Sequence, residues 1–333
     1  MPQISVVIPN WNGAAFLPAC LDALRAQTFR DFETVLVDNG SADDSVSLAR
    51  RQYPEVTVIE LPQNRGFSAA VNHGIRNSAG DIVALLNNDT QADPRWLERA
   101  ADCMARHPRA GSVACLVVCL GREHVIDSAG DEAAPWGAVF NRGHLHPAGP
   151  PFDAETPVFG FCGSAALIRR AVFHDIGLFD ETMFAYYEDL DMNLRARLRG
   201  WDCVYCPDAV VRHRYSGSTH GTGLKLGTEE VYLHLTGVWL KNMPARVMLR
   251  HILSATAFHA LILFFHGVAR VRGRNRMPRV PVIRFLNAML QQRPAVQKSR
   301  TASAADFEKH FMKMSFFRFA LNELAGAGKA RRG

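Results

Sequence analysis

The sequence lacks several short motifs that identify common nucleotide-binding and hydrolytic enzymes. The loop after the first apolar segment has no Gly-x-Gly-x-x-Gly pattern, which argues against a dinucleotide-binding fold. No Gly-x-x-x-x-Gly-Lys-Ser/Thr pattern is present, so a P-loop is excluded. The residues around Ser164 (Phe-Cys-Gly-Ser-Ala-Ala) do not form the Gly-x-Ser-x-Gly turn of α/β-hydrolases. An internal repeat is also absent.

Cysteine is present but without a recognisable framework. The seven cysteines are scattered and odd in number, which does not suggest paired disulfides. Cys203 and Cys206 form a Cys-x-x-Cys, but no second pair and no histidine at zinc-finger spacing accompany them. Reduced thiols in a cytosolic protein are the simpler interpretation. The N-terminus lacks a charged segment followed by a long apolar core and a cleavage site, so we expect a cytoplasmic main domain.

Charge and length set broad limits. The formal net charge of +6 permits an anionic partner, such as nucleic acid, a membrane surface or a phosphorylated substrate, without choosing among them. The 48% hydrophobic and 21% charged content is ordinary for a globular chain and argues against disorder. A chain of 333 residues is long for one compact domain, so we expect a main domain with an appendage.

Apolar β-branched segments alternate with helical patterns in the first third of the chain. The expected strands are 4–8, 33–37, 56–61 and 81–86, and the expected helices are 16–27, 41–52 and 66–77. The order βαβαβαβ predicts a mainly parallel sheet with helices on both faces. In such sheets, ligands bind beyond the carboxyl ends of the strands.

Polar residues follow three of these strands, in 9–12, 38–41 and 87–90. Asp38 could accept the N3–H of a uracil or thymine ring, or form a turn before the next helix. Asp89 could give an oxygen ligand to Mg²⁺ or Mn²⁺, or cap the following helix.

The second half is less regular. We expect a loop over the site at 136–157, a strand at 159–168, a helix at 188–199, and short strands at 202–206 and 210–214. Glu188, Asp189 and Asp191 open the helix, where acidic residues compensate the helix dipole. One of them could instead be a general base toward an acceptor hydroxyl. His213 is a lone histidine, and it indicates a functional role only together with the other polar residues.

Taken together, these segments resemble the family 2 glycosyltransferases of the GT-A fold. The matching stretches follow the family's order over roughly residues 3–220: 5–13, 37–43, 64–72, 86–90, 163–170, 177–181, 187–191 and 207–218. The resemblance is greatest to rhamnosyltransferase-type enzymes of bacterial surface polysaccharide assembly. It implies a GT-A catalytic domain over 1–228, with a nucleotide-sugar half (1–95) and an acceptor half (96–228), followed by a helical region over 229–333.

The resemblance also implies roles for individual residues. Asp189 matches the catalytic base, with Glu188 beside it, and Asp89 and His213 match ligands of a divalent cation, Mn²⁺ or Mg²⁺. The implied nucleotide-binding residues are Pro9, Asn10, Asn12, Asp38, Arg65, Asn72 and Asn88. The implied reaction is inverting transfer of a sugar, with rhamnose as the best match, from a nucleotide diphosphate donor to a glycan acceptor. The family's metal motif is often Asp-x-Asp, whereas Asn87 is neutral, so cation binding would rest on Asp89, His213 and the diphosphate.

Residues 252–268 are strongly apolar. At about 1.5 Å per residue they barely reach across the ~30 Å hydrocarbon core of a bilayer. A narrow polar stripe favours an interfacial helix over a spanning one, and an arginine-rich segment over 270–279 suits anionic headgroups. The stripe consists of His251, His259, His266 and Arg270. This pattern predicts peripheral attachment at the inner face of the plasma membrane and fits a polyprenyl-linked acceptor. Packing against the main domain or a partner subunit is the alternative, and a homo-oligomer is compatible with it.

Other functions fit less well. Nucleotidyltransferases share this general fold, but they usually open with a glycine-rich, arginine-containing loop that Pro9–Gly13 does not match. A catalytically degenerate nucleotide-sugar-binding scaffold finds support in Asn87, but Asp89, Asp189 and His213 are all retained. We expect no nucleic-acid partner, because the arginine cluster follows an apolar helical segment without a recognised binding motif.

Overall fold

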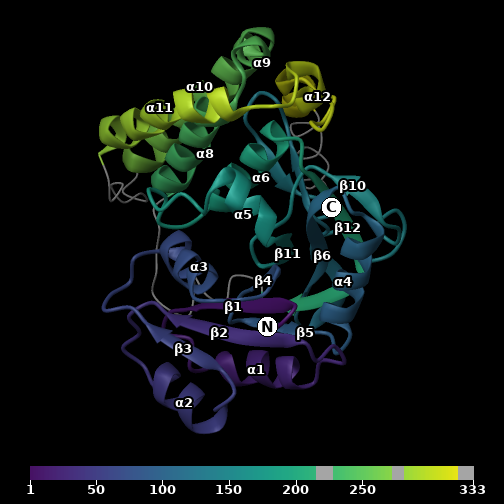
Figure 1. Cartoon of the computed structure of the whole chain (residues 1–333). Helices are drawn as coiled ribbons and strands as arrows, with labels where there is room; N and C mark the ends of the chain where they lie inside the picture. The colour runs from purple at the N-terminus through teal and green to yellow at the C-terminus, as the bar shows by residue number, and fades with distance from the viewer. Residues whose placement is uncertain (215–227, 272–280, 322–333) are drawn as a thin grey trace, which may run out of the picture. The chain divides into compact units, whose positions relative to one another are not determined.

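The computed structural model describes residues 1–214, 228–271 and 281–321 (Figure 1). The chain divides into two compact units. The first comprises residues 1–131 and 140–225, and the second comprises residues 132–139 and 226–333. The second unit therefore includes a short piece of chain that interrupts the first.

The first unit is built on one large mixed β-sheet. Its strands are β1 (Ile4–Asn10), β2 (Phe32–Asp38), β3 (Thr57–Glu60), β4 (Ile82–Leu86), β5 (Thr90–Ala92), β6 (Ala110–Cys119), β7 (Arg122–Ser128), β10 (Thr156–Val158), β11 (Ala165–Arg169) and β12 (Asp202–His213). The main order is β10-β12-β6-β11-β4-β1-β2-β3, with β5 beside β12 and β7 beside β6. Strands β3, β2, β1 and β4 are parallel, as the sequence predicts. Strand β11 is antiparallel to both β4 and β6.

Helices cover both faces of this sheet. They are α1 (Leu17–Arg25), α2 (Ser45–Gln52), α3 (Phe67–Arg76), α4 (Trp96–Arg106), α5 (Arg170–Ile176) and α6 (Glu188–Leu198). Successive strand residues point to opposite faces. Val6 packs in the core with α1, α2 and α4, and Val7 packs in the core with α3, α5 and α6. Figure 1 shows α1 and α2 on one side of β1 and β2, with α3 on the other. Burial on both faces explains the continuous apolar strands.

Two predicted strand boundaries were wrong. The strand expected at 159–168 begins only at Ala165, and the residues before it form a loop beside the site. The two strands expected at 202–206 and 210–214 are one strand, β12, whose pairing with β6 shifts between Cys206 and Val210. Pro207 lies in this shift, because proline has no N–H for the ladder. The predicted loop 136–157 contains β9 (Val139–Asn141), which pairs with β8 (Asp131–Ala133).

The second unit is helical. Its elements are α8 (Thr228–Asn242), α9 (Ala245–Arg250), α10 (Ile252–Val271), α11 (Val282–Ser299) and α12 (Ala304–Glu308). The inserted segment 132–139 supplies part of its core. Trp136 is buried there, donates its indole N–H to the carbonyl of Met314 at 2.8 Å, and packs edge-on against Phe258. The unit's core therefore depends on residues far apart in the sequence.

None of the helices in the described parts of the chain is long and apolar enough to cross a membrane. Two predicted features lie outside the described residues. These are positions 215–218 of the last family motif and the arginines Arg272, Arg274, Arg276 and Arg279.

Candidate active site

A pocket of about 450 Å³ lies in the first unit at the carboxyl ends of its parallel strands. Its walls come from the ends of β1 and β12, from residues 87–89 after β4, from residues 162–164 before β11, and from the first turn of α6. Because β11 runs antiparallel to β4, its amino end lies beside the carboxyl end of β4. The topology therefore converges several polar segments on one cavity, where α/β sheets bind ligands.

The pocket brings together seven of the eleven residues predicted for the site. They are Pro9, Asn10, Asn88, Asp89, Glu188, Asp189 and His213. They come from four separate elements or loops between positions 9 and 213 of the chain. Tertiary folding, rather than local spacing, assembles the site.

Asn10 links the ends of β1, β2 and β4. Its amide N–H donates to Asp38 Oδ1 at 2.9 Å, and its Oδ1 accepts from Asn88 Nδ2 at 2.7 Å. A Cβ on Gly13 would lie only 2.2 Å from Asn10 Oδ1, so this turn requires glycine. Asp38 does not line the pocket, since both of its oxygens accept from the Asn10 amide or from Ser41. Asp38 thus holds Asn10 in place. It also forms the turn before the next helix, which was the alternative to binding a nucleotide base.

Three other predicted nucleotide-binding residues do not line the pocket. Asn12 has a left-handed backbone (φ 49°) and accepts from the N–H of Ala42 through Oδ1. Arg65 is exposed, with a guanidinium nitrogen 3.5 Å from Glu181. Asn72 is fully buried in α3, and its amide exchanges hydrogen bonds with the backbone of Phe179. The contacts of Asn72 fasten α3 to residues 179–181 and account for its polar side chain without a nucleotide.

Asp189 is held in a defined orientation in the first turn of α6. Its Oδ2 accepts from the N–H of Gly163 at 2.9 Å, and its Oδ1 accepts from the N–H of Leu190 at 2.8 Å. Burial raises the pKa of this carboxyl, whereas the two backbone donors oppose the rise. The orientation is therefore fixed before any ligand binds.

Two further carboxyls share this region. Burial, followed by the charge of Asp189, raises the pKa of Glu188 to about 8. The same two causes, in the same order, raise the pKa of buried Asp131 well above its ordinary value. The charge of Asp189 thus raises the pKa of both neighbours, and burial raises the pKa of Asp189 itself. Buried carboxyls with perturbed pKa values are typical of acid–base sites.

The chain enters α6 through two strained residues. Tyr186 and Tyr187 have φ values of 71° and 70°, a left-handed conformation that is unusual for bulky side chains. Tyr186 also lines the pocket. Strain of this kind is retained where the surrounding structure fixes it, commonly at functional sites. It places Glu188 and Asp189 at the pocket wall.

His213 connects two carboxylates at the end of β12. Its Nδ1 lies 2.7 Å from Asp127 Oδ2, and its Nε2 lies 3.3 Å from Asp89 Oδ1. Burial alone would lower the pKa of His213, but its hydrogen bonds to Asp127 and Asp89 and their charges raise it to about 9. The hydrogen bond to Asp127 fixes which ring nitrogen faces the pocket.

The donor atoms in this corner fit a divalent cation. Asp89 offers a carboxylate and His213 offers Nε2. The side-chain oxygen of Asn87 is buried and has no hydrogen-bond partner among the described residues. A buried oxygen of this kind is costly unless something binds it. Oxygen ligands with one imidazole suit Mn²⁺ and Mg²⁺. Asn87, the departure from the family pattern, is thus able to contribute a neutral ligand.

Two carboxylates of the site were missed from the sequence. Asp127 lies near the end of β7, and Asp131 follows it after a turn with Gly130 at φ +90°. A carboxylate between an apolar strand and a glycine turn is the signal that identified Asp38. It was obscured here because the strand begins with the polar residues Arg122–His124.

The model of the family described as "Glycosyl transferase family 2" matches residues 5–177, which is more than half of the chain. The chain belongs to glycosyl transferase family 2. A curated relative is N-acetylglucosaminyl-diphospho-decaprenol L-rhamnosyltransferase of Mycobacterium tuberculosis. It is 30% identical over 243 residues, which cover 65% of this chain and 77% of the relative. The protein is therefore a rhamnosyltransferase-like glycosyltransferase, as its motifs indicate.

Solved structures show the fold of this glycosyltransferase. GalNAc-T7 with UDP, GalNAc and Mn²⁺ aligns with a TM-score of 0.58 and 17% identity, over 72% of this chain and 47% of that protein. TarS of S. aureus with UDP aligns with a TM-score of 0.52 and 16% identity, over 90% and 91%. These similarities confirm the predicted GT-A fold. The family assignment removes the nucleotidyltransferase alternative.

Proposed function

We propose that this glycosyltransferase inverts the anomeric centre of rhamnose as it moves the sugar from a nucleoside diphosphate to a hydroxyl of a lipid-linked glycan. The observation that supports it most is one pocket that contains both an oriented carboxylate, Asp189, and a cation-binding corner, Asp89 with His213. The choice of sugar and acceptor follows the name of the mycobacterial relative, N-acetylglucosaminyl-diphospho-decaprenol L-rhamnosyltransferase.

The chemistry is a single displacement. The acceptor oxygen forms a bond to C1 of the sugar while the bond from C1 to the diphosphate oxygen breaks. Asp189 accepts the proton of the attacking hydroxyl, because its carboxyl lines the pocket and is oriented by the N–H groups of Gly163 and Leu190. Asn87, Asp89 and His213 would hold a divalent cation, which would supply positive charge for the departing diphosphate.

The nucleotide would bind along the ends of β1, β2 and β4. Pro9, Asn10 and Asn88 line the pocket there, and Asp38 orients Asn10 through the hydrogen bond at 2.9 Å. In this proposal Arg65 and Asn12 contact the donor only after local rearrangement, because neither lines the pocket. We also propose that residues 1–95 form the half that binds the nucleotide sugar and residues 96–228 the half that binds the acceptor.

A donor panel tests the proposed sugar. We expect dTDP-rhamnose to bind and be hydrolysed slowly in the presence of Mn²⁺ or Mg²⁺, with much weaker binding after chelation. The comparison donors are UDP-galactose, UDP-glucose, UDP-N-acetylglucosamine and GDP-mannose. Calorimetry gives the affinities, and the anomeric configuration of a transfer product by NMR tests inversion. Preference for another donor contradicts the choice of rhamnose, and binding of none contradicts the enzyme mechanism.

The surface of α10 supports membrane attachment. In the predicted polar stripe, His259 Nδ1 lies 3.1 Å from Thr236 Oγ1, and burial lowers the pKa of His259 to about 4. Leu253 and Phe264 are 77% and 64% exposed. They are eleven residues apart, close to three helical turns, and so share one face. An exposed apolar helix face suits a lipid surface.

Flotation with anionic liposomes tests this attachment. The variant with both Leu253→Ser and Phe264→Ser should partition at least about tenfold less, since burying each side chain contributes about 1.5–3 kcal/mol when complete. The matched control is Leu145→Ser, because Leu145 is an exposed leucine (58%) in the first unit. Unchanged flotation of the double variant, or an equal loss of flotation in the control, would show that the apolar face of α10 does not attach the protein to the membrane.

A further inference from the structure

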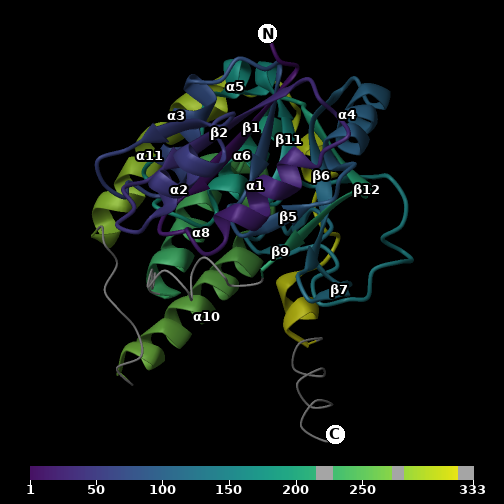
Figure 2. The same ribbon diagram turned by 90° about the horizontal axis from the view of Figure 1, so that it is seen from below.

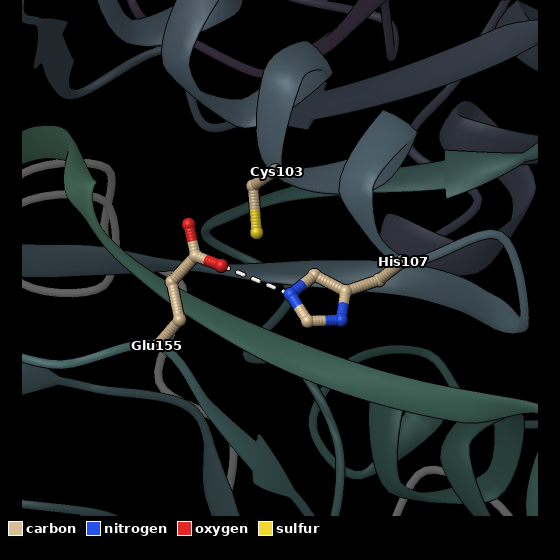
Figure 3. Close-up of side chains that lie close together, drawn as sticks. All are labelled: Cys103, His107 and Glu155. Atoms are coloured by element: carbon tan, nitrogen blue, oxygen red, sulfur yellow. Dashed lines mark hydrogen bonds and ion pairs between the residues drawn. The ribbon is translucent and has the colours of Figure 1, made fainter.

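A second cluster of metal-ligating side chains lies in the first unit, outside the pocket. Cys103 is buried on α4, His107 is the residue that caps the end of α4, and Glu155 directly precedes β10. One ligand atom from each lies within 4.8 Å of the other two. Figure 3 shows the thiol of Cys103 directed toward the space between Glu155 and the His107 ring. None of the three lines the active-site pocket.

Local structure explains why these side chains meet. Cys103 and His107 are four residues apart at the end of a helix, so their side chains lie on the same face. The carboxyl end of a helix carries partial negative charge, which favours a cation. Strand β10 is paired with β12, which brings Glu155 beside this end of α4. The helix spacing and the strand pairing thus bring the donor atoms together, at a helix end whose charge favours a cation.

The nearby Cys-x-x-Cys divides between two cores. Cys206, on β12, packs in the same core cluster as Cys103. Cys203 lies in the same strand but in the core on the opposite face, because an odd spacing reverses the direction of a strand side chain. The Cys-x-x-Cys visible in the sequence is therefore not a pair in space.

We propose that Cys103, His107 and Glu155 bind Zn²⁺. Thiolate, imidazole and carboxylate ligands in a tetrahedral set are characteristic of zinc. Zinc distances of about 2.0–2.3 Å require neighbouring donor atoms about 3.3–3.8 Å apart, a small adjustment from the present cluster. Binding releases the proton of the Cys103 thiol, because only a thiolate ligates the ion.

The surroundings support this assignment. His107 Nε2 is 2.9 Å from one oxygen of Glu155, Oε2, and the guanidinium of Arg106 binds the other. Zn²⁺ would replace the first contact and leave the second, so that Arg106 orients the ligating carboxylate. The Cys103 thiolate and the Glu155 carboxylate carry two negative charges, which the ion balances. The simpler interpretation is a surface ion-pair cluster of Arg106, His107 and Glu155 over a buried cysteine.

The experiment measures binding of Zn²⁺ and Co²⁺ by the full chain under reducing conditions. The Asp89→Asn background is used so that the active-site corner does not contribute. We expect one equivalent of Zn²⁺, a higher melting temperature with Zn²⁺, and a sulfur-to-cobalt charge-transfer band with Co²⁺. The band requires a thiolate ligand, so it distinguishes this cluster from sites made of carboxylates and histidines.

Variants locate the ion. Cys103→Ser should weaken Zn²⁺ binding by more than about 100-fold, beyond the 10–100-fold typical of groups outside the ligand set, and should remove the cobalt band. His107→Gln is a second test at a half-exposed position that the core does not need. Cys203→Ala is the matched control, because Cys203 is a buried thiol on β12 outside the cluster. Zinc binding that survives both Cys103→Ser and His107→Gln, or no thiolate band with Co²⁺, overturns the proposal. The outcome does not depend on which sugar the enzyme transfers.

Discussion

Replacing Asp189 with asparagine is expected to lower kcat by about 10²–10⁴-fold while donor affinity stays close to that of the wild type. The amide keeps an acceptor oxygen for the N–H of Gly163, so the fold of the first turn of α6 should persist. It cannot accept the proton of the attacking hydroxyl. Steady-state transfer kinetics and calorimetric donor binding on the same preparation separate the two effects. Wild-type turnover by this variant would mean that another group is the base.

Glu188→Gln distinguishes the two neighbouring carboxyls. Because burial, followed by the charge of Asp189, raises the pKa of Glu188 to about 8, an amide resembles the protonated carboxyl, and the loss in kcat should be much smaller than for Asp189→Asn. A larger loss of kcat for Glu188→Gln than for Asp189→Asn would indicate that Glu188, and not Asp189, is the base. Asp208→Asn, an exposed aspartate paired with Arg99, is the control for an acidic residue outside the pocket.

The same assignment predicts the pH profile. Burial raises the pKa of Asp189, so its carboxyl binds a proton at a higher pH than a solvent-exposed aspartate, whose pKa is about 3.9. A base must be deprotonated, and activity should therefore fall as pH decreases through this raised pKa. The acidic limb of kcat/KM should lie above pH 4 and disappear in Asp189→Asn. An acidic limb of kcat/KM at the pKa of a solvent-exposed aspartate would contradict the claim that burial raises the pKa of Asp189.

The second large effect is expected for Asp89→Asn, which should abolish the dependence of donor binding on Mn²⁺ or Mg²⁺. Loss of the ligand carboxylate should weaken Mn²⁺ binding by more than about 100-fold. Asp127→Asn should weaken it by about 10–100-fold, because Asp127 orients His213 without reaching the ion. Electron paramagnetic resonance of free Mn²⁺, with nucleoside diphosphate present, measures both losses.

His144→Asn is the matched control for Asp127→Asn. His144 also contacts Asp127, with its Nδ1 3.5 Å from Asp127 Oδ1, but it does not line the pocket. Its replacement should leave Mn²⁺ affinity unchanged. Equal affinity of Asp127→Asn and the wild type would show that the 2.7 Å contact to His213 has no influence on the cation.

Local patterns were sufficient for the parallel half of the fold. The apolar strands near Ile4–Ile8 and 81–86, and the helices between them, were predicted with boundaries within a few residues. They are predictable because parallel strands are buried on both faces and so have continuous apolar sequences. The antiparallel strand β11 was misplaced because the loop before it, at 159–164, is also buried and apolar. Burial alone does not distinguish a strand from a loop that lines a pocket.

The predicted site shows a similar division. Residues at strand ends and at a helix start line the pocket, since topology dictates where those positions meet. Asn72 was assigned to the nucleotide from the family resemblance, and this role stays a prediction. Its hydrogen bonds to Phe179 join segments more than a hundred positions apart, which no local pattern reports. Asp127 gained significance only through its contact with His213, 86 residues later.

The sequence by itself determined the alternation of strands and helices, the family motifs and the polar residues that follow each strand, because these depend on side-chain periodicity and on turns of a few residues. The tertiary structure decided which carboxyl the N–H of Gly163 orients, which histidine nitrogen faces Asp89 and which side chains lie beside the thiol of Cys103. It also decided that α10 exposes Leu253 and Phe264. These properties arise from burial and from distances between atoms on different elements, and such distances are fixed only when the sheet and its helices pack together.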